Sequence, residues 1–437
     1  MPAHDWPRFV RVRQRFAADR VADTRAAARE GAARVLAEHD LAPGARVAIT
    51  AGSRGVAELV DLYRGVADAV RAAGAEPFLF TAMGSHGGGT ADGQRALLAS
   101  LGVTEASVGM PLSCSSEVVR IGETEKPIAG LPVYVAAEAA DADGVFVVNR
   151  VKPHTSFHGP YESGPLKMLA VGMGRADGAS MVHRLGWAAM GDAIASVSAV
   201  VRDRLPVLGA LAVVENAYEQ PAVVEGVPEP ALDEREAALL ERARLWLPTL
   251  PVDELDLCVV REMGKNLSGT GMDTNVIGRL RIQGIPEPPS PRIAYLGVLD
   301  LSEASHGNAT GIGLADFATA RLVAKIDAEA TNLNCLTTGS PVRAAVPMTL
   351  ADDRALFDAV WQALRPERGA DVRAAVVANT LHLDELWLSE RSRTDAGDAV
   401  ETVGEPAEPS FDGEGNLVLA QRRGREPGDA DCLPRPQ

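Results

Sequence analysis

The run Gly144-Val-Phe-Val-Val-Asn149 is continuously apolar until its last residue, which is typical of a strand buried on both faces of a sheet. Two similar runs precede it, Arg46-Val-Ala-Ile-Thr50 and Pro77-Phe-Leu-Phe-Thr81, and segments of helical composition separate the three. Strands that alternate with helices indicate βαβ units, in which the strands run parallel. The first half of the chain is therefore predicted to form a mostly parallel sheet flanked by helices.

A second α/β pattern follows a break in the chain. Residues 221–230 are rich in Pro and Glu and are expected to form a loop, and Pro248-Thr-Leu-Pro251 resembles a hinge. The later pattern predicts strands at 255–260, 293–299 and 372–377 and helices at 314–326 and 352–364. We expect two α/β domains, residues 1–247 and 248–393, with the active site in the cleft between them. Residues 394–437 form an acidic Gly/Pro-rich tail that we expect to be poorly ordered.

Composition excludes several classes of protein. The 437 residues carry a formal charge of −16, which argues against a general binder of nucleic-acid phosphates. No stretch approaches 18 apolar residues, so no membrane span is expected, and residues 1–21 lack the apolar segment of a secretory signal. Cys114, Cys258, Cys335 and Cys432 show no C-x-x-C spacing, so neither a disulfide framework nor a cysteine zinc site is indicated. We expect a cytoplasmic protein.

Polar loops follow all three strands of the first half. The first loop carries Arg54, the second carries Gly84, Ser85 and His86, and the third carries His154. Ligands of open parallel sheets bind at the carboxyl ends of the strands, so an arginine and two histidines are expected at one rim. His86 in its Gly-rich turn could act as a general base beside backbone N–H groups that hold an anion. The alternative is a turn histidine whose glycines only permit positive φ.

His154 and His158 are four residues apart, but Pro153 and Pro160 argue against a helix and therefore against a helical metal pair. One of the two histidines as an acid or base is the better interpretation, and an ordinary surface histidine is the alternative for His158. Lys167 lies in an apolar run, where burial would disfavour its charged form and make the amine a nucleophile. The alternative is a lysine that extends its ammonium into water.

Two further segments bear on function. His183 lies on a predicted helix, where a half-buried structural histidine is the plain interpretation. Lys265 lies in the Gly-rich loop 263–275 after a predicted strand, and it could bind an anion or belong to a surface loop; the loop 305–311 is a weaker case. P-loop, G-x-S-x-G and H-E-x-x-H motifs are absent, so nucleotide hydrolases, serine hydrolases and zinc peptidases lack support.

Taken in order, these segments resemble the nickel-dependent lactate racemase family. The resemblance covers about residues 40–190, and each motif is weak alone, whereas the ordered set is specific. The 16 residues from Lys167 to His183 (183 − 167) also resemble the family's spacing. The matching segments are Val47-Ala-Ile-Thr-Ala-Gly-Ser-Arg54, Thr81-Ala-Met-Gly-Ser-His86, Lys152-Pro-His154 and Ser163-Gly-Pro-Leu-Lys167.

The resemblance implies a racemase or epimerase of a lactate-like 2-hydroxy acid. It implies a nickel-pincer nucleotide (pyridinium-3,5-bisthiocarboxylic acid mononucleotide nickel), built by cofactor-maturation proteins and linked covalently through Lys167. By resemblance His183 completes the nickel coordination. Hydride would move reversibly from C2 of the substrate to the cofactor through a 2-keto acid intermediate.

The same resemblance assigns the remaining residues. His86 and His154 would act as acid and base on opposite faces of the substrate, and Arg54, together with Lys265, would bind its carboxylate. The Gly-rich loop with Gly84 and Ser85 would contact the cofactor, because glycine loops at helix N-termini suit a phosphate.

Departures from the family leave alternatives open. The segment from His154 to Lys167 spans 13 residues (167 − 154), about three more than the family pattern, so His158 could take the role of His154. One other function is a non-catalytic small-anion or nucleotide-binding protein of the same fold. Another is an enzyme that uses a free metal ion bound by His86, His154 and His158.

Overall fold

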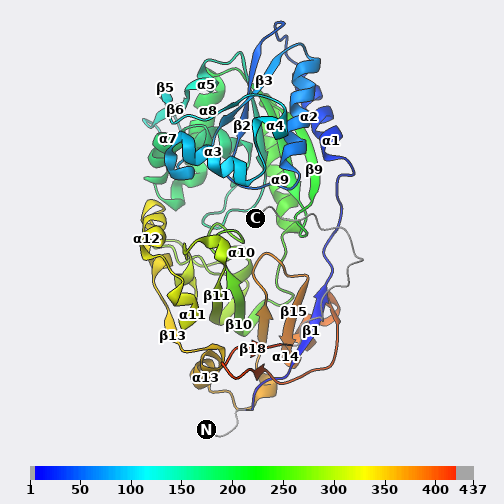
Figure 1. Cartoon of the computed structure of the whole chain (residues 1–437), viewed down its shortest axis with the longest axis vertical. Helices are drawn as coiled ribbons and strands as arrows, with labels where there is room; N and C mark the ends of the chain where they lie inside the picture. The colour runs from blue at the N-terminus through cyan, green and yellow to red at the C-terminus, as the bar shows by residue number, and fades with distance from the viewer. Residues whose placement is uncertain (1–4, 420–437) are drawn as a thin grey trace. The chain divides into compact units, whose positions relative to one another are not determined.

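The computed structural model describes residues 5–419, which form two compact units. The N-terminal unit contains residues 17–247, and the C-terminal unit combines residues 5–16 with residues 248–419. Each unit is a mixed α/β structure built on one large sheet with helices packed against it (Figure 1). Within residues 5–419 no helix combines the length and apolar character needed to cross a membrane.

The sheet of the N-terminal unit has six strands, and five of them run parallel. Only its last strand is antiparallel to its neighbour. The three strands predicted from apolar runs are its central members β3, β2 and β7, and helices connect them as predicted. In spatial order the strands are β4 (Leu112–Ser113), β3 (Glu76–Thr81), β2 (Arg46–Ala51), β7 (Gly144–Arg150), β8 (Val207–Glu215) and β9 (Pro221–Pro228).

Helices α1 and α2 pack against one face of this sheet, where their apolar residues share a core with Val47 and Ile49 of β2. The two helices cross closely at Gly65, where a Cβ would lie 2.4 Å from the Arg25 carbonyl oxygen. The helices of this unit are α1 (Thr24–Leu36), α2 (Leu59–Ala72), α3 (Ala91–Ser100), α4 (Glu105–Val108), α5 (Ala137–Ala140), α6 (Pro165–Lys167), α7 (Arg175–His183), α8 (Met190–Arg204) and α9 (Leu232–Trp246). A hairpin of β5 (Val118–Glu123) and β6 (Pro132–Ala136) lies outside the main sheet.

The segment predicted as the loop 221–230 is instead the edge strand β9. Its prolines, Pro221 and Pro228, stand at the two ends of the strand, where a missing N–H does not interrupt the ladder with β8. Gly226 in its middle packs against α1, since a Cβ there would lie 1.9 Å from the Gly31 carbonyl oxygen. Proline content alone therefore misled the prediction.

The sheet of the C-terminal unit has eight strands. Strands β10 to β14 pair in parallel, whereas β15, β1 and β16 extend the sheet by antiparallel pairing. In spatial order they are β13 (Met348–Leu350), β12 (Phe317–Thr319), β11 (Arg292–Leu301), β10 (Glu254–Met263), β14 (Ala374–Val377), β15 (Glu385–Ser389), β1 (Phe9–Gln14) and β16 (Val400–Thr402). The helices are α10 (Thr274–Ile277), α11 (Ala320–Ala324), α12 (Ala328–Thr337), α13 (Asp353–Leu364) and α14 (Glu390–Ala396).

Two predictions for this unit are corrected. Residues 9–14 were placed in the first domain, but they form β1, whose buried Val10 and Val12 belong to the core of the C-terminal unit. The predicted helix over 314–326 is the strand β12 followed by the short helix α11. The chain passes from strand to helix at Thr319, whose hydroxyl accepts a hydrogen bond from the Leu322 N–H and so begins α11.

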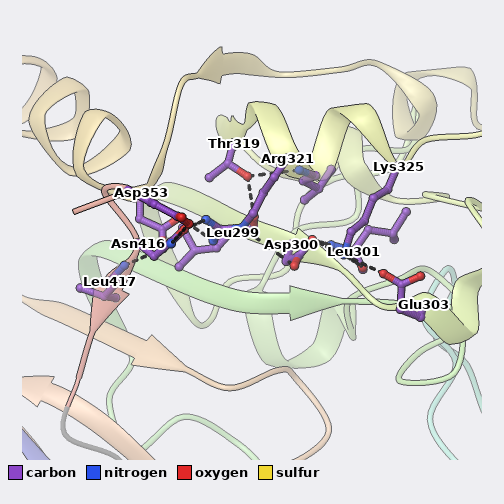
Figure 2. A network of polar contacts seen from close by, with 12 residues as sticks. Leu299, Asp300, Leu301, Glu303, Thr319, Arg321, Lys325, Asp353, Asn416 and Leu417 are labelled. Carbon is purple, nitrogen blue, oxygen red and sulfur yellow. Dashed lines mark hydrogen bonds and ion pairs between the residues drawn. The ribbon is translucent and has the colours of Figure 1, made fainter. Parts of the chain in front are cut away.

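The predicted tail over 394–437 is partly folded. It contains the end of α14, β16 and a hairpin of β17 (Ser410–Phe411) and β18 (Leu417–Val418). The buried Asp353 carboxylate accepts a hydrogen bond from the Leu417 N–H at 2.8 Å, and Arg321 bonds both Asp353 (2.5 Å) and Asn416 (2.7 Å), so the hairpin is tied to α11 and α13 (Figure 2). Residues 420–437, with Cys432, lie outside the described residues.

Candidate active site

The three loops predicted to carry chemistry leave one edge of the N-terminal sheet. Strands β3, β2 and β7 are neighbours and run parallel, so their carboxyl ends lie side by side, as the sequence predicted. Arg54 follows β2, His86 follows β3 and His154 follows β7. The fold therefore brings these three side chains to one rim.

The β2 and β3 loops contact each other directly, because Ser53 Oγ and His86 Nδ1 are hydrogen bonded. His86 is exposed, and it precedes three successive glycines with positive φ, residues 87–89, before α3 begins. Gly84 also has positive φ, and its N–H donates to the Gly172 carbonyl oxygen at 3.2 Å. The neighbouring Ser85 is exposed. This backbone conformation is one that only glycine adopts readily, which explains the loop's composition.

Residues 152–163 form a loop that we call the histidine loop. Backbone hydrogen bonds join its two ends, Lys152 and Ser163, at 2.9 and 3.2 Å. The loop contains no helix, as its prolines predicted, so His154 and His158 are not placed by helical spacing. His154 is half-buried and His158 is exposed.

A buried carboxylate that the sequence reasoning missed organises the histidine loop. Glu162 has no exposed surface, and its Oε2 accepts the His154 N–H at 2.6 Å. Its Oε1 accepts the Gly159 N–H at 3.1 Å and the Arg244 guanidinium at 2.6 Å, and lies 3.2 Å from His158 Nδ1. Burial alone would raise the pKa of Glu162, but hydrogen bonds, first from His158, outweigh it and lower that pKa. The available signal was that Glu162 is the single acidic residue of this loop.

Lys167 ends the short helix α6, and a π-helical turn over Met168–Gly172 follows it, a local irregularity that is frequent at functional sites. Two contacts fix the start of this segment: Asn149 at the end of β7 donates to the Gly164 carbonyl oxygen at 2.8 Å, and Glu236 of α9 accepts the Leu166 N–H at 2.7 Å. Burial raises the pKa of Glu236 to about 8, so this carboxylic acid is mostly neutral at pH 7.

The amine of Lys167 is in an unusual electrostatic environment. Burial of the amine and the positive charge of Arg54 lower the pKa of Lys167 to about 7, while the charge of Glu162 opposes the shift. Nζ lies 5.5 Å from the centre of the Phe157 ring, and Lys167 as a whole is half-buried. A lowered pKa is what a desolvated amine would have, and the role of Lys167 as an attachment point stays a prediction.

His183 is the last residue of α7 and is half-buried. Burial and the nearby charge of Lys167 lower the pKa of His183 to about 4, so the imidazole is neutral at physiological pH. A neutral imidazole offers a lone pair to a metal ion without first losing a proton.

Two aromatic rings bring Lys167, His154 and His183 into one cluster. Phe157 and Trp187 are stacked with their ring centres 6.1 Å apart. His154 lies 4.5 Å from the Phe157 ring and 5.6 Å from the Trp187 ring, and His183 lies 5.6 Å from Trp187. Residues from the histidine loop, α6 and α7 thus meet at one place.

The second cation predicted for substrate binding, Lys265, belongs to the C-terminal unit. Its ammonium donates to the Gly269 carbonyl oxygen at 2.7 Å and to Asn334 Oδ1 at 3.2 Å. Its backbone N–H donates to Ser305 Oγ at 2.9 Å, so the two polar loops singled out in the second half of the sequence contact each other. Its assignment to the substrate stays a prediction.

Within residues 5–419 no group of three or more His, Cys, Asp or Glu side chains is arranged to hold a metal ion by itself.

No protein-family model matches the chain, and no curated protein matches it. Among solved structures the chain is similar to the lactate racemase apoprotein from Thermoanaerobacterium thermosaccharolyticum. The similarity has a TM-score of 0.50 and 12% sequence identity, and it covers 85% of this chain and 98% of the other. This likeness shows that the chain shares the α/β fold of that protein.

Proposed function

We propose that this chain is a racemase or epimerase of a small 2-hydroxy acid that carries a nickel-pincer nucleotide on Lys167. The observation that carries the proposal is the meeting of Lys167, His183 and His154 around the Phe157–Trp187 pair. The fold shared with a lactate racemase apoprotein supports it.

The residues present fit such a cofactor. An amine with a pKa of about 7 is half neutral at pH 7, which suits Lys167 as the residue that would hold the cofactor covalently. His183 is neutral and can complete the coordination of a metal whose other ligands come from an organic group. When bound, the nickel-pincer nucleotide would supply reversible two-electron chemistry at C2 of the hydroxy acid.

Arg54 is assigned to the substrate carboxylate. Surrounding protein atoms and the charge of Arg150 lower the pKa of Arg54, but a guanidinium keeps its charge near neutral pH. Its planar donors suit bidentate pairing with a carboxylate.

Proton transfer is assigned to histidines. A racemase receives the 2-hydroxyl group in two orientations, so it needs a proton acceptor for each. His86, hydrogen bonded to Ser53, would serve one, and a residue of the histidine loop would serve the other. The Gly-rich turn with Gly84 and Ser85 would hold the nucleotide phosphate through its backbone.

The test is a racemisation assay on protein produced together with cofactor-maturation enzymes. Enantiopure 2-hydroxy acids of increasing side-chain size are supplied, and chiral chromatography follows the appearance of the other enantiomer. Wild type should approach an equal mixture of the two enantiomers for at least one acid. Lys167→Arg, which keeps a positive charge, should show no racemisation. Unchanged turnover by Lys167→Arg would refute the attachment role. A loaded protein that binds these acids without interconverting them would favour the non-catalytic binding protein.

A further inference from the structure

In the histidine loop, the hydrogen bonds place the ring proton on a different nitrogen in each of the two histidines. Glu162 is an ionised carboxylate, since its pKa is lowered, and can only accept hydrogen bonds. His158 Nδ1 lies 3.2 Å from Glu162 Oε1, so it must carry the proton of that bond. In neutral His158 the other nitrogen, Nε2, is therefore a bare proton acceptor.

His154 has the opposite arrangement. Its Nδ1 accepts the backbone N–H of Ser156 at 3.1 Å, so in the neutral ring the proton resides on Nε2. The His154 ring contacts the rings of both Phe157 and Trp187, and its backbone N–H donates to Glu162 Oε2. Neutral His154 thus presents a hydrogen-bond donor where His158 presents an acceptor.

We propose that Glu162 is a positioning residue that makes His158, and not His154, the proton acceptor of this loop, with His154 as a hydrogen-bond donor to the substrate. The catalytic part of this inference rests on the proposed function. A histidine whose Nδ1–H is held by a buried carboxylate is oriented and stabilised as it gains a proton at Nε2, which is what a general base requires.

Hydrogen-bond donors and positively charged groups surround Glu162, as expected if its negative charge orients the His158 ring. Arg244 of α9 faces it from one side and the Lys167 amine acts on it from α6, while His154 and His158 approach within the loop. One buried carboxylate therefore links the loop backbone, an arginine and a histidine ring. If it served only to hold the backbone, hydrogen bonds from the two N–H groups would suffice and the contact with the His158 ring would be unnecessary.

The first experiment needs neither cofactor nor activity. ¹⁵N NMR of histidine-labelled full-length apoprotein, at a pH where the rings are neutral, distinguishes Nδ1–H from Nε2–H rings. The spectra of His154→Gln and His158→Gln assign the two signals among the eight histidines of the chain. The inference predicts Nδ1–H for His158 and Nε2–H for His154. An Nε2–H ring for His158 would overturn it.

The second experiment uses the loaded enzyme. His158→Gln should lower kcat by about 10²–10⁴-fold, the range for loss of a general base, whereas His154→Gln should act chiefly on KM. Glu162→Gln removes the charge and leaves only one accepting oxygen, and it should lower kcat. A full kcat in His158→Gln would overturn the inference even if His154→Gln is inactive. Correct tautomers in a protein without racemase activity would instead refute the proposed function and leave the proton assignment standing.

Discussion

Replacing Lys167 by Met tests the electrostatic feature on which the site depends. The pKa of Lys167 is about 7 in the folded chain, against an ordinary value of 10.5. A pKa difference of one corresponds to about 1.4 kcal/mol. The difference of 3.5 (10.5 − 7) therefore corresponds to a preference of about 4–5 kcal/mol for the neutral amine. The side chain keeps part of its surface in solvent, and we therefore expect about 2–4 kcal/mol in practice.

Proton binding determines whether the stability rises or falls with pH. Between pH 7 and 10.5 the unfolded chain holds a proton on Lys167 that the folded chain has lost, so the unfolding free energy of wild type rises over this range. Below pH 7 the folded state bears the full cost of the buried charge. Lys167→Met removes that cost, so the apoprotein variant should be more stable by about 2–4 kcal/mol at pH 7, and the gain should vanish toward pH 10.5.

Urea unfolding of both apoproteins between pH 6 and 10 measures this difference. The matched control is Lys126→Met, which alters an exposed lysine of the same unit and should change stability by no more than about 0.5 kcal/mol at any pH. Equal stabilities of wild type and Lys167→Met across the pH range would refute the desolvated amine, and with it the physical reason for placing the cofactor there.

Three further predictions follow from other contacts. Glu236 has a raised pKa of about 8 against 4.5, so wild type should lose stability as pH rises from about 4.5 to 8, and urea titrations of Glu236→Gln should lack that loss. Asp353→Ala should release the β17–β18 hairpin, which faster amide hydrogen exchange over residues 410–419 would reveal, while the exchange of β10 stays slow. Arg54→Gln should move the pH midpoint for acetylation of Lys167 upward, and mass spectrometry of the labelled peptide checks it; an unmoved midpoint would exclude Arg54 as a cause of the shift.

Local signals in the sequence predicted the elements that position the site. Apolar runs identify β2, β3 and β7 because both faces of a central parallel strand are buried, and the parallel arrangement then places the three following loops at one edge. Thr90 likewise begins α3 through a local contact, because its hydroxyl accepts the Gly93 N–H. These features depend on residues close together in the chain.

Features that depend on distant partners could not be predicted. Strand β1 reads as a basic N-terminal stretch, and its role appears only when it pairs with β15, more than 370 residues later. Glu162 gains its importance from Arg244 and from closure of the histidine loop, neither of which leaves a local pattern. The lowered pKa of Lys167 likewise depends in part on Arg54, which another segment brings to it.

The most direct test of the central claim is the mass of the Lys167 peptide, with the nickel content, of protein produced together with the cofactor-maturation enzymes. The account predicts a nucleotide adduct on Lys167 and about one nickel per chain, both absent from Lys167→Arg. An unmodified Lys167 in a nickel-free protein would contradict it.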